Sequence, residues 1–386
     1  MRARDLGIVI GLGVPGPLNA ITDVSGVWVG HATIIEGDGP LVVGKGPVRT
    51  GVTVIRPHDG VPAEEPVFAG FHSLNGNGEV TGLQWIRESG QLTSPIGLTN
   101  SHSVGIVRDT LVAIDCEARQ PGHLYWSLPV AGETWDGVLN DINGFHVKAG
   151  HVRQAYEAAS GGPVAEGSVG GGTGMICYDF KGGIGTSSRV LPPDAGGYTV
   201  GVLVQANFGS RDDYLVNGAP VGRHLNGDVI PLPAPPEYEA HPPAGACAPP
   251  PVAGSIVGIV ATDAPLLPHQ CDRLARRVGL GVSRTGNAGD HWSGDIFVAF
   301  STANRLPGSG MTWPAPLTSQ VKVLSNNHID PLFDSVVEAT QEAILNAQLA
   351  AETMVGRDGV TAHALDPERL AAVLRKYDRL RSGPSA

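Results

Sequence analysis

The 386-residue sequence predicts an α+β protein in which antiparallel sheets are covered by helices. Short apolar stretches rich in β-branched residues occur in both halves of the chain, with few helical segments between them. The 54 glycines, about twice the usual share, and the 31 prolines favour many tight turns over a helical bundle. We therefore expect two or more sheets with a limited number of helices packed on them.

Composition also limits the classes of function that the chain can have. Apolar residues make up 41% of the chain, which is enough for a substantial core and argues against disorder. The net charge of −11 argues against nucleic acid or an anionic membrane surface as partner. No stretch is long and apolar enough for a membrane-spanning helix, and the apolar run at 8–10 is too short for a signal peptide. Scattered cysteines without a CxxC pair predict free thiols and a cytoplasmic location: Cys116, Cys177, Cys247 and Cys271.

In the first sixty residues, short strands are expected at 27–29, 41–43 and 51–55. Residues 11–16 match the dinucleotide-binding pattern GxGxxG. The prolines that follow disrupt the helix that such a site requires, so nucleotide binding is not expected.

Two polar, glycine-rich segments, 70–79 and 98–103, are predicted to be loops that carry site residues. Each contains a histidine, His72 and His102. No further histidine or carboxylate stands at ligand spacing, so these side chains are expected to form structural hydrogen bonds, and no metal is expected.

The middle of the chain has a predicted helix at 145–159 and a buried strand at 201–209 that ends in polar Asn207. Between them, the glycines of 167–174 are expected to let the backbone pass close to a neighbour. A phosphate loop is not favoured, because no GK[ST] follows and residues 175–178 continue as a strand.

A proline-rich connector at 231–253 is predicted to be exposed and extended, because no helix or strand can run through so many prolines. Directly after it, residues 254–263 form an apolar, β-branched segment typical of a buried strand. Further on, we expect helices at 268–277 and 330–354 and a strand within 293–300.

The Gly254–Ser255 bond joins this connector to the core strand, and two interpretations remain open from the residues alone. The dipeptide can mark the end of a loop. Alternatively, the chain is cut here and Ser255 becomes an N-terminal nucleophile, whose own α-amine, with a pKa of about 7.7–8.0, serves as base. Glycine suits the position before the cut, since it tolerates backbone strain and leaves room for attack on its carbonyl.

Six ordered blocks resemble the DmpA family of aminopeptidases, the L-aminopeptidase/D-esterases that include β-peptidyl aminopeptidases. The blocks span nearly the whole chain: 16–24, 71–79, 170–174, 204–207, 254–256 and 293–297. The resemblance implies one structural domain with a four-layer αββα sandwich, like that of N-terminal nucleophile hydrolases but with different strand connections. It also implies self-cleavage into an α chain, 1–254, and a β chain, 255–386, which assemble as oligomers of αβ units.

The resemblance assigns Ser255 as the nucleophile and Asn207 as the oxyanion donor. Ser293 and Asp295 correspond to the pair that orients the nucleophile's amine and hydroxyl. The implied substrates are small peptides, amino-acid amides or esters, and no cofactor is implied.

Two further residues are candidates for substrate binding. Glu133 can pair with the free amino group of a substrate, or form a plain surface salt bridge. Trp135 stands where the family often has a tyrosine that helps the oxyanion site. It can donate a hydrogen bond but not ionise, so it either forms a wall of the pocket or is a core aromatic.

Three alternatives to the aminopeptidase remain. A nylon-oligomer-type ω-amino amide hydrolase and an ornithine-type acetyltransferase share this kind of architecture, although both typically use threonine as nucleophile. A non-enzymatic, uncleaved binding protein on the same scaffold is the third, and the presence of Ser255, Asn207, Ser293 and Asp295 argues against it.

Overall fold

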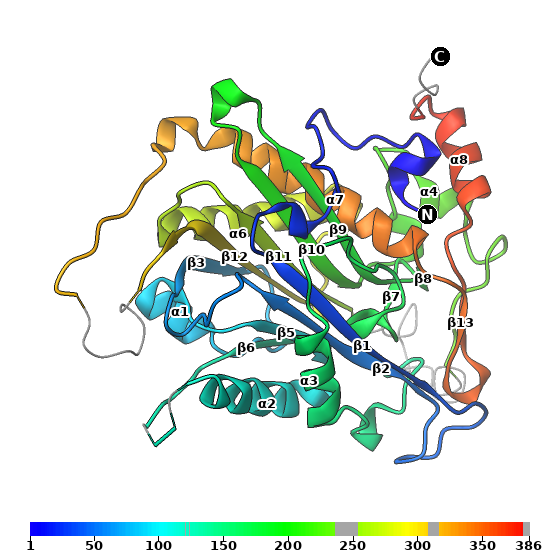
Figure 1. Ribbon diagram of the computed structural model, residues 1–386. Helices are drawn as coiled ribbons and strands as arrows, with labels where there is room; N and C mark the ends of the chain where they lie inside the picture. The colour runs from blue at the N-terminus through cyan, green and yellow to red at the C-terminus, as the bar shows by residue number, and fades with distance from the viewer. Residues whose placement is uncertain (120, 123, 236–253, 308–315, 381–386) are drawn as a thin grey trace.

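The computed structural model describes residues 1–119, 121–122, 124–235, 254–307 and 316–380 (Figure 1). Two β-sheets lie face to face, and each carries helices on its outer face, which gives the four-layer αββα order expected from the sequence. In the larger sheet the strand order is β4 (Gln91–Leu92), β3 (Val67–Ser73), β12 (Gly294–Arg305), β11 (Ser255–Thr262), β10 (Thr199–Asn207) and β9 (Gly183–Val190). In the smaller sheet it is β1 (Trp28–Glu36), β2 (Val48–Arg56), β5 (Ile96–Asn100) and β6 (Val130–Thr134).

Helices α6 (Pro268–Ser283) and α7 (Asp330–Leu349) pack on the larger sheet, and α2 (Val104–Glu117) and α3 (Ala149–Glu157) pack on the smaller one. Shorter elements lie around this framework: α1 (Leu83–Ser89), α4 (Val221–His224), α8 (Pro367–Lys376) and the strand pairs β7 (Ile176–Cys177) with β8 (Phe180–Lys181) and β13 (Met354–Val355) with β14 (Thr361–Ala362). No helix among the described residues has the length and apolar character needed to cross a membrane.

The alternating strand pattern builds two cores. Val257 and Ile259 of β11 point between the sheets, where they meet side chains of β5 and β10 such as Leu98 and Leu203. The intervening residues, including Ile256, point the other way into the core beneath α6 and α7. Strand β11 is therefore buried on both faces, which explains its uninterrupted apolar sequence.

Most strand pairs are antiparallel as predicted, but two are parallel. β11 pairs parallel with β12 after a crossover through α6, and β5 pairs parallel with β6 after a crossover through α2. The first of these pairs places the start of β11 beside the start of β12.

Several sequence predictions are corrected. Residues 41–43 form a turn with an isolated bridge, because glycines with positive φ at 39, 44 and 46 bend the chain away from a strand. The predicted strand at 175–178 stops at Cys177 in a tight hairpin. The first residues of both predicted loops belong to strands, β3 and β5. The first predicted helix after the connector extends to Ser283, and the last ends at Leu349. Of the predicted connector 231–253, residues 236–253 lie outside the described residues.

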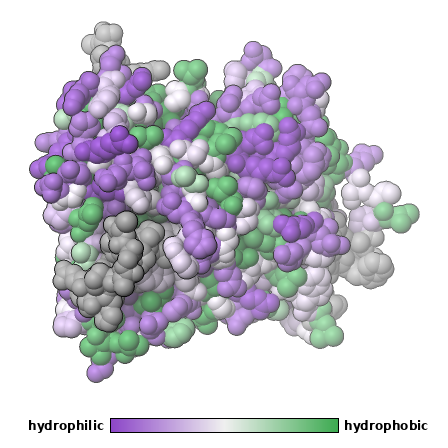
Figure 2. Space-filling model, turned by 180° about the vertical axis from the view of Figure 1, so that it is seen from behind, coloured by the Kyte–Doolittle hydropathy of each residue, from purple (hydrophilic) through white to green (hydrophobic). Residues whose placement is uncertain are grey.

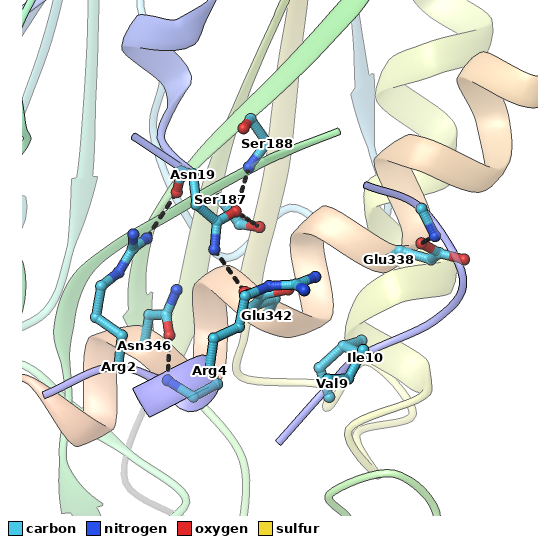
Figure 3. Close-up of polar contacts among 12 residues, drawn as sticks. Arg2, Arg4, Val9, Ile10, Asn19, Ser187, Ser188, Glu338, Glu342 and Asn346 are labelled. Carbon is cyan, nitrogen blue, oxygen red and sulfur yellow. Dashed lines mark hydrogen bonds and ion pairs between the residues drawn. The ribbon is translucent and has the colours of Figure 1, made fainter. Parts of the chain in front are cut away.

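The N-terminal segment is held against α7 by a buried polar network (Figure 3). Glu342 of α7, which is fully buried, accepts hydrogen bonds from Arg4 and from the Asn19 side chain. Asn346, one turn further along, accepts from the Ala3 N–H and donates to the Thr186 carbonyl of β9. On the face shown in Figure 2, hydrophilic side chains predominate and hydrophobic ones form separate patches.

Candidate active site

The candidate site lies at one end of the larger sheet, where three neighbouring strands begin or end. Asn207 is the last residue of β10, Ser255 is the first of β11, and Gly294 is the first of β12. The strand register sets Ser255 directly opposite Asn207 on one side and Gly294 on the other. Both polar side chains are buried, at 4% exposed for Ser255 and 3% for Asn207.

The Ser255 hydroxyl accepts a hydrogen bond from the Gly294 N–H at 3.1 Å. The preceding residue, Gly254, lies tightly against β10. A Cβ at Gly254 would lie 3.0 Å from the Phe208 Cα and 3.1 Å from the Asn207 carbonyl oxygen, so a side chain at this position would press on the neighbouring backbone. Glycine therefore fits the residue before the proposed cleavage point.

Two hydrogen bonds fix the Asn207 amide. Its Oδ1 accepts from the Ile176 N–H at 2.8 Å, and its Nδ2 donates to the Trp135 carbonyl at 2.9 Å. These partners determine which end of the amide is oxygen, since one is a donor and the other an acceptor. Among the described residues, no partner occupies the second N–H of Nδ2, so one amide donor of Asn207 is left over.

Ser293 and Asp295 form a buried pair at the start of the next strand, with Ser293 just before β12 and Asp295 within it. The Ser293 hydroxyl donates to Asp295 Oδ1 at 2.5 Å. Asn75, from the segment after β3, donates through Nδ2 to Asp295 Oδ2 at 3.3 Å and accepts the Asp295 N–H at 2.6 Å. Burial raises the pKa of Asp295, while the hydrogen bonds from Ser293, Asn75 and the Ile256 N–H act in the opposite direction. Sequence reasoning did not single out Asn75, although it lies within a family block.

Glu133 reaches the site from the other sheet, near the end of β6. Its Oε1 accepts the Glu79 N–H at 2.8 Å, and Ser101 donates its hydroxyl to Oε2. A Cβ at Gly78 would lie 3.2 Å from Glu133 Oε1 and 3.0 Å from the Gly294 Cα, so only a glycine separates this carboxylate from the strand beside Ser255.

The environment of Glu133 rules out a surface salt bridge. The residue is 6% exposed, and within the described part of the chain it forms no ion pair. Burial raises its pKa, with the Ser101 and Glu79 hydrogen bonds opposing. A buried carboxylate without a cation is suited to receive one from a ligand.

The Trp135 side chain is half-buried, and its role as pocket wall or core aromatic stays a prediction. It is partly buried against a small apolar cluster formed by Val138, Leu139, Ile176, Val360 and Ala362. Its contact with the site runs through the backbone, because its carbonyl oxygen holds Asn207.

The two histidines noted in the sequence are not joined in a site. His72 lies in β3, and the ring of His102 stacks on Phe145. Among the described residues, no group of three or more potential metal ligands occurs.

A buried serine at the start of a strand, with an amide on one side and a hydroxyl–carboxylate pair on the other, is an arrangement suited to a hydrolase with a serine nucleophile. Solved structures agree with this class. The L-aminopeptidase D-Ala-esterase/amidase of Ochrobactrum anthropi, described as a prototype for the serine aminopeptidases and a variant of the Ntn hydrolase fold, is 44% identical with a TM-score of 0.87, covering 98% of this chain and 99% of that one. A β-aminopeptidase of a Burkholderia species is 51% identical with a TM-score of 0.88 and full coverage of both chains.

The chain belongs to peptidase family S58, whose model matches residues 19–362. It is 48% identical over 379 residues to the β-peptidyl aminopeptidase BapA of Sphingosinicella microcystinivorans, covering 98% of this chain and 93% of the relative. BapA of Sphingosinicella xenopeptidilytica is 45% identical, with 97% and 91% covered. The expected fold and family are thus confirmed, and the protein is a serine aminopeptidase.

Proposed function

We propose that the protein is a self-processing β-peptidyl aminopeptidase. It cleaves its own chain between Gly254 and Ser255, and then uses Ser255 to remove N-terminal residues, those of β-amino acids included, from short peptides, amides and esters. The observation that carries this proposal is the pairing of Ser255 with Asn207 at the start of β11. The similarity to two β-peptidyl aminopeptidases supports the choice of β-peptides.

Self-cleavage begins when the Ser255 hydroxyl oxygen attacks the carbonyl carbon of Gly254. The bond from that carbon to the Ser255 nitrogen breaks, the nitrogen takes up a proton to become a free amine, and the acyl group moves to the Ser255 oxygen as an ester. Water then hydrolyses this ester. The products are a Gly254 carboxylate and a free Ser255 with both its amine and its hydroxyl.

In turnover, the Ser255 α-amine accepts the proton of its own hydroxyl as the oxygen attacks the substrate carbonyl. The developing oxyanion receives the remaining N–H of Asn207. The leaving amine takes the proton, and water hydrolyses the acyl-enzyme. Asp295, with Ser293 bonded to it, supplies the negative charge that stabilises the ammonium formed after proton transfer.

Glu133 binds the free amino group of the substrate in this scheme. Its two hydrogen bonds, from Ser101 and from the Glu79 N–H, hold the carboxylate in one orientation. The cation of a substrate would compensate for the cost of keeping this carboxylate buried. A free amino group is thereby required, which is the defining preference of an aminopeptidase.

We further propose that the processed chains assemble as oligomers of αβ units in the cytoplasm, without metal or organic cofactor. The family resemblance supports the assembly, and the free thiols of Cys116, Cys177 and Cys271 support the reducing compartment. Light scattering of the processed protein tests the assembly. An activity assay with and without a chelator tests the absence of a metal requirement.

The deciding experiment compares the wild type with Ser255→Ala on a denaturing gel. We expect two bands for the wild type, an N-terminal sequence that starts at Ser255, and release of β-alanine from a β-alanyl anilide. Ser255→Ala should stay full-length and inactive. A persistent full-length wild type without turnover, or turnover by the alanine variant, contradicts the proposal. Product analysis with an added amine acceptor separates hydrolysis from acyl transfer.

A further inference from the structure

A fully buried lysine lies directly behind the candidate oxyanion donor. Lys181 ends strand β8, and the short hairpin register places it opposite Ile176 of β7. Its ammonium donates to the carbonyl oxygens of Met175 at 2.8 Å, Gly182 at 2.9 Å and Gly172 at 3.3 Å.

Burying a lysine in this way is costly, and no carboxylate among the described residues forms an ion pair with it. Burial lowers the pKa of Lys181 to about 7, while the nearby Cys177 and Asp136 act in the opposite direction. A methionine or leucine would fill the same space without this cost. The ammonium is therefore best explained by the three carbonyl groups that it holds.

One of these carbonyls belongs to the peptide unit that fixes Asn207. The Met175 carbonyl accepts from Lys181, and the N–H of the same peptide unit, that of Ile176, donates to Asn207 Oδ1. A trans peptide is planar, and its C=O and N–H point in opposite directions. An ammonium that holds the C=O on one side therefore aims the N–H at Asn207 on the other, and polarises the peptide so that this N–H becomes a stronger donor.

We propose that Lys181 is a positioning residue for the oxyanion donor: through the Met175–Ile176 peptide it fixes the side-chain amide of Asn207 in the orientation that stabilises the transition state. The inference rests on the proposed function, in which Asn207 supplies that donor. An oxyanion donor is effective only when it is held in place before the reaction. The Met175 carbonyl also accepts the Gly182 N–H at 2.9 Å. Without the ammonium, the peptide would keep that backbone bond but lose its second donor, and the orientation of the Asn207 amide would be less tightly defined.

The test is a double-mutant cycle with Lys181→Met and Asn207→Ala, analysed on processed enzyme with active sites counted by an acylation burst. Lys181→Met alone should lower kcat roughly 10- to 100-fold and leave KM within about threefold, because the donor acts on the transition state. In the Asn207→Ala background, the same substitution should lower kcat less than about twofold, since its effect passes through Asn207. Independent, multiplying losses would overturn the proposal.

Lys181→Gln and Lys181→Arg keep polar donors and should recover part of the lost kcat. Asn346→Leu is the matched control, because it also removes a buried polar side chain bonded to two backbone groups, here Ala3 and Thr186. It should lower the melting temperature without changing kcat per active site.

The single variants distinguish the oxyanion role of Asn207 from the positioning role of Lys181. If Asn207→Ala keeps full kcat, the oxyanion assignment within the proposed function is wrong. If Asn207→Ala loses kcat but Lys181→Met lowers only the melting temperature, Lys181 is structural and the positioning role is wrong. If none of the three Lys181 variants gives folded enzyme, Lys181 is needed for folding, and the proposed positioning role is also wrong.

Discussion

Asn207 and Ser255 face each other across the antiparallel pair β10–β11, the last residue of one strand against the first of the next. Residues paired in this way have their Cα atoms roughly 4.5–5.5 Å apart. The spacing between the proposed nucleophile and its oxyanion donor is thus set by the hydrogen-bond ladder of the central sheet. A rigid element of this kind keeps reacting groups in place better than two loops would.

Replacement of Asn207 tests the donor directly. Asn207→Ala should lower kcat roughly 100- to 1,000-fold, as loss of one oxyanion donor does elsewhere, with little change in KM. Steady-state kinetics on an aminoacyl anilide measure this. A rise in KM with an unchanged kcat would instead assign Asn207 to ground-state binding.

Glu133→Gln should weaken substrates that carry a free amino group. Because the proposed ion pair is buried, we expect KM to rise about 10- to 100-fold with a smaller effect on kcat. Burial raises the pKa of Glu133, so on acidification this carboxylate is protonated at a higher pH than an ordinary glutamate. In the wild type, KM should therefore begin to rise at that higher pH. An N-acetylated ester is the control: its slow hydrolysis should be the same in both enzymes. Equal losses for both substrates would contradict the assignment.

The acid limb of kcat should contain two steps, one for protonation of the Ser255 α-amine, which has an ordinary pKa of about 7.7–8.0, and one at lower pH for Asp295. Burial raises the pKa of Asp295, and the carboxylate form is the one that stabilises the ammonium, so activity should fall on the acid side above the ordinary range of an aspartate. Asp295→Asn should lower kcat and remove the step at lower pH, while the step of the α-amine remains. A pH profile of kcat at saturating substrate tests this. If the step at lower pH is unchanged in the variant, a group other than Asp295 causes it.

His31 should make the fold sensitive to acid. Burial lowers the pKa of His31 from 6.5 to about 4, and its Nδ1 bonds with the Thr53 hydroxyl under the glycine segment 170–172. Between those two pH values the unfolded chain takes up a proton that the folded protein does not. The contribution of neutral His31 to the free energy of unfolding should therefore be complete above pH 6.5 and be lost as the pH falls towards 4.

Melting temperatures measured between pH 4 and pH 7 test this slope. His31→Gln should flatten it, whereas His328→Gln, which replaces an exposed histidine, should leave it unchanged. Parallel slopes in wild type and His31→Gln would show that other groups cause the acid sensitivity.

Much of this fold can be predicted from local sequence, because several elements are determined by the residues within them and at their ends. The β-branched run after Gly254 predicts β11 almost to the residue, and Asp330 with Pro331 marks the start of α7. The site residues can be predicted only from the family blocks. A serine, an asparagine and an aspartate lie far apart in the sequence, and nothing in the residues around them indicates that they come together in the fold. Their roles stay predictions.

Long-range pairing is what the sequence did not disclose. The parallel pairing of β11 with β12 brings Gly294 beside Ser255, and nothing near either residue encodes a partner strand. The β7–β8 hairpin was missed for a different reason. Its turn has Tyr178 and Asp179 at positive φ in place of the glycines that usually mark such turns. The sequence therefore does not indicate that Lys181 folds back onto the Met175 carbonyl.

The strand order has a consequence for the proposed cleavage. In the larger sheet, β12 and β11 lie between β3 on one side and β10 on the other, so the two strands that follow Ser255 are enclosed by strands that precede it. Once the Gly254–Ser255 bond is cut, the two polypeptides are interleaved within one sheet and can part only if that sheet unravels. Reassembly would then require two separate chains to meet, so the proposed cleavage would turn a unimolecular fold into a kinetically trapped one whose recovery after denaturation depends on concentration.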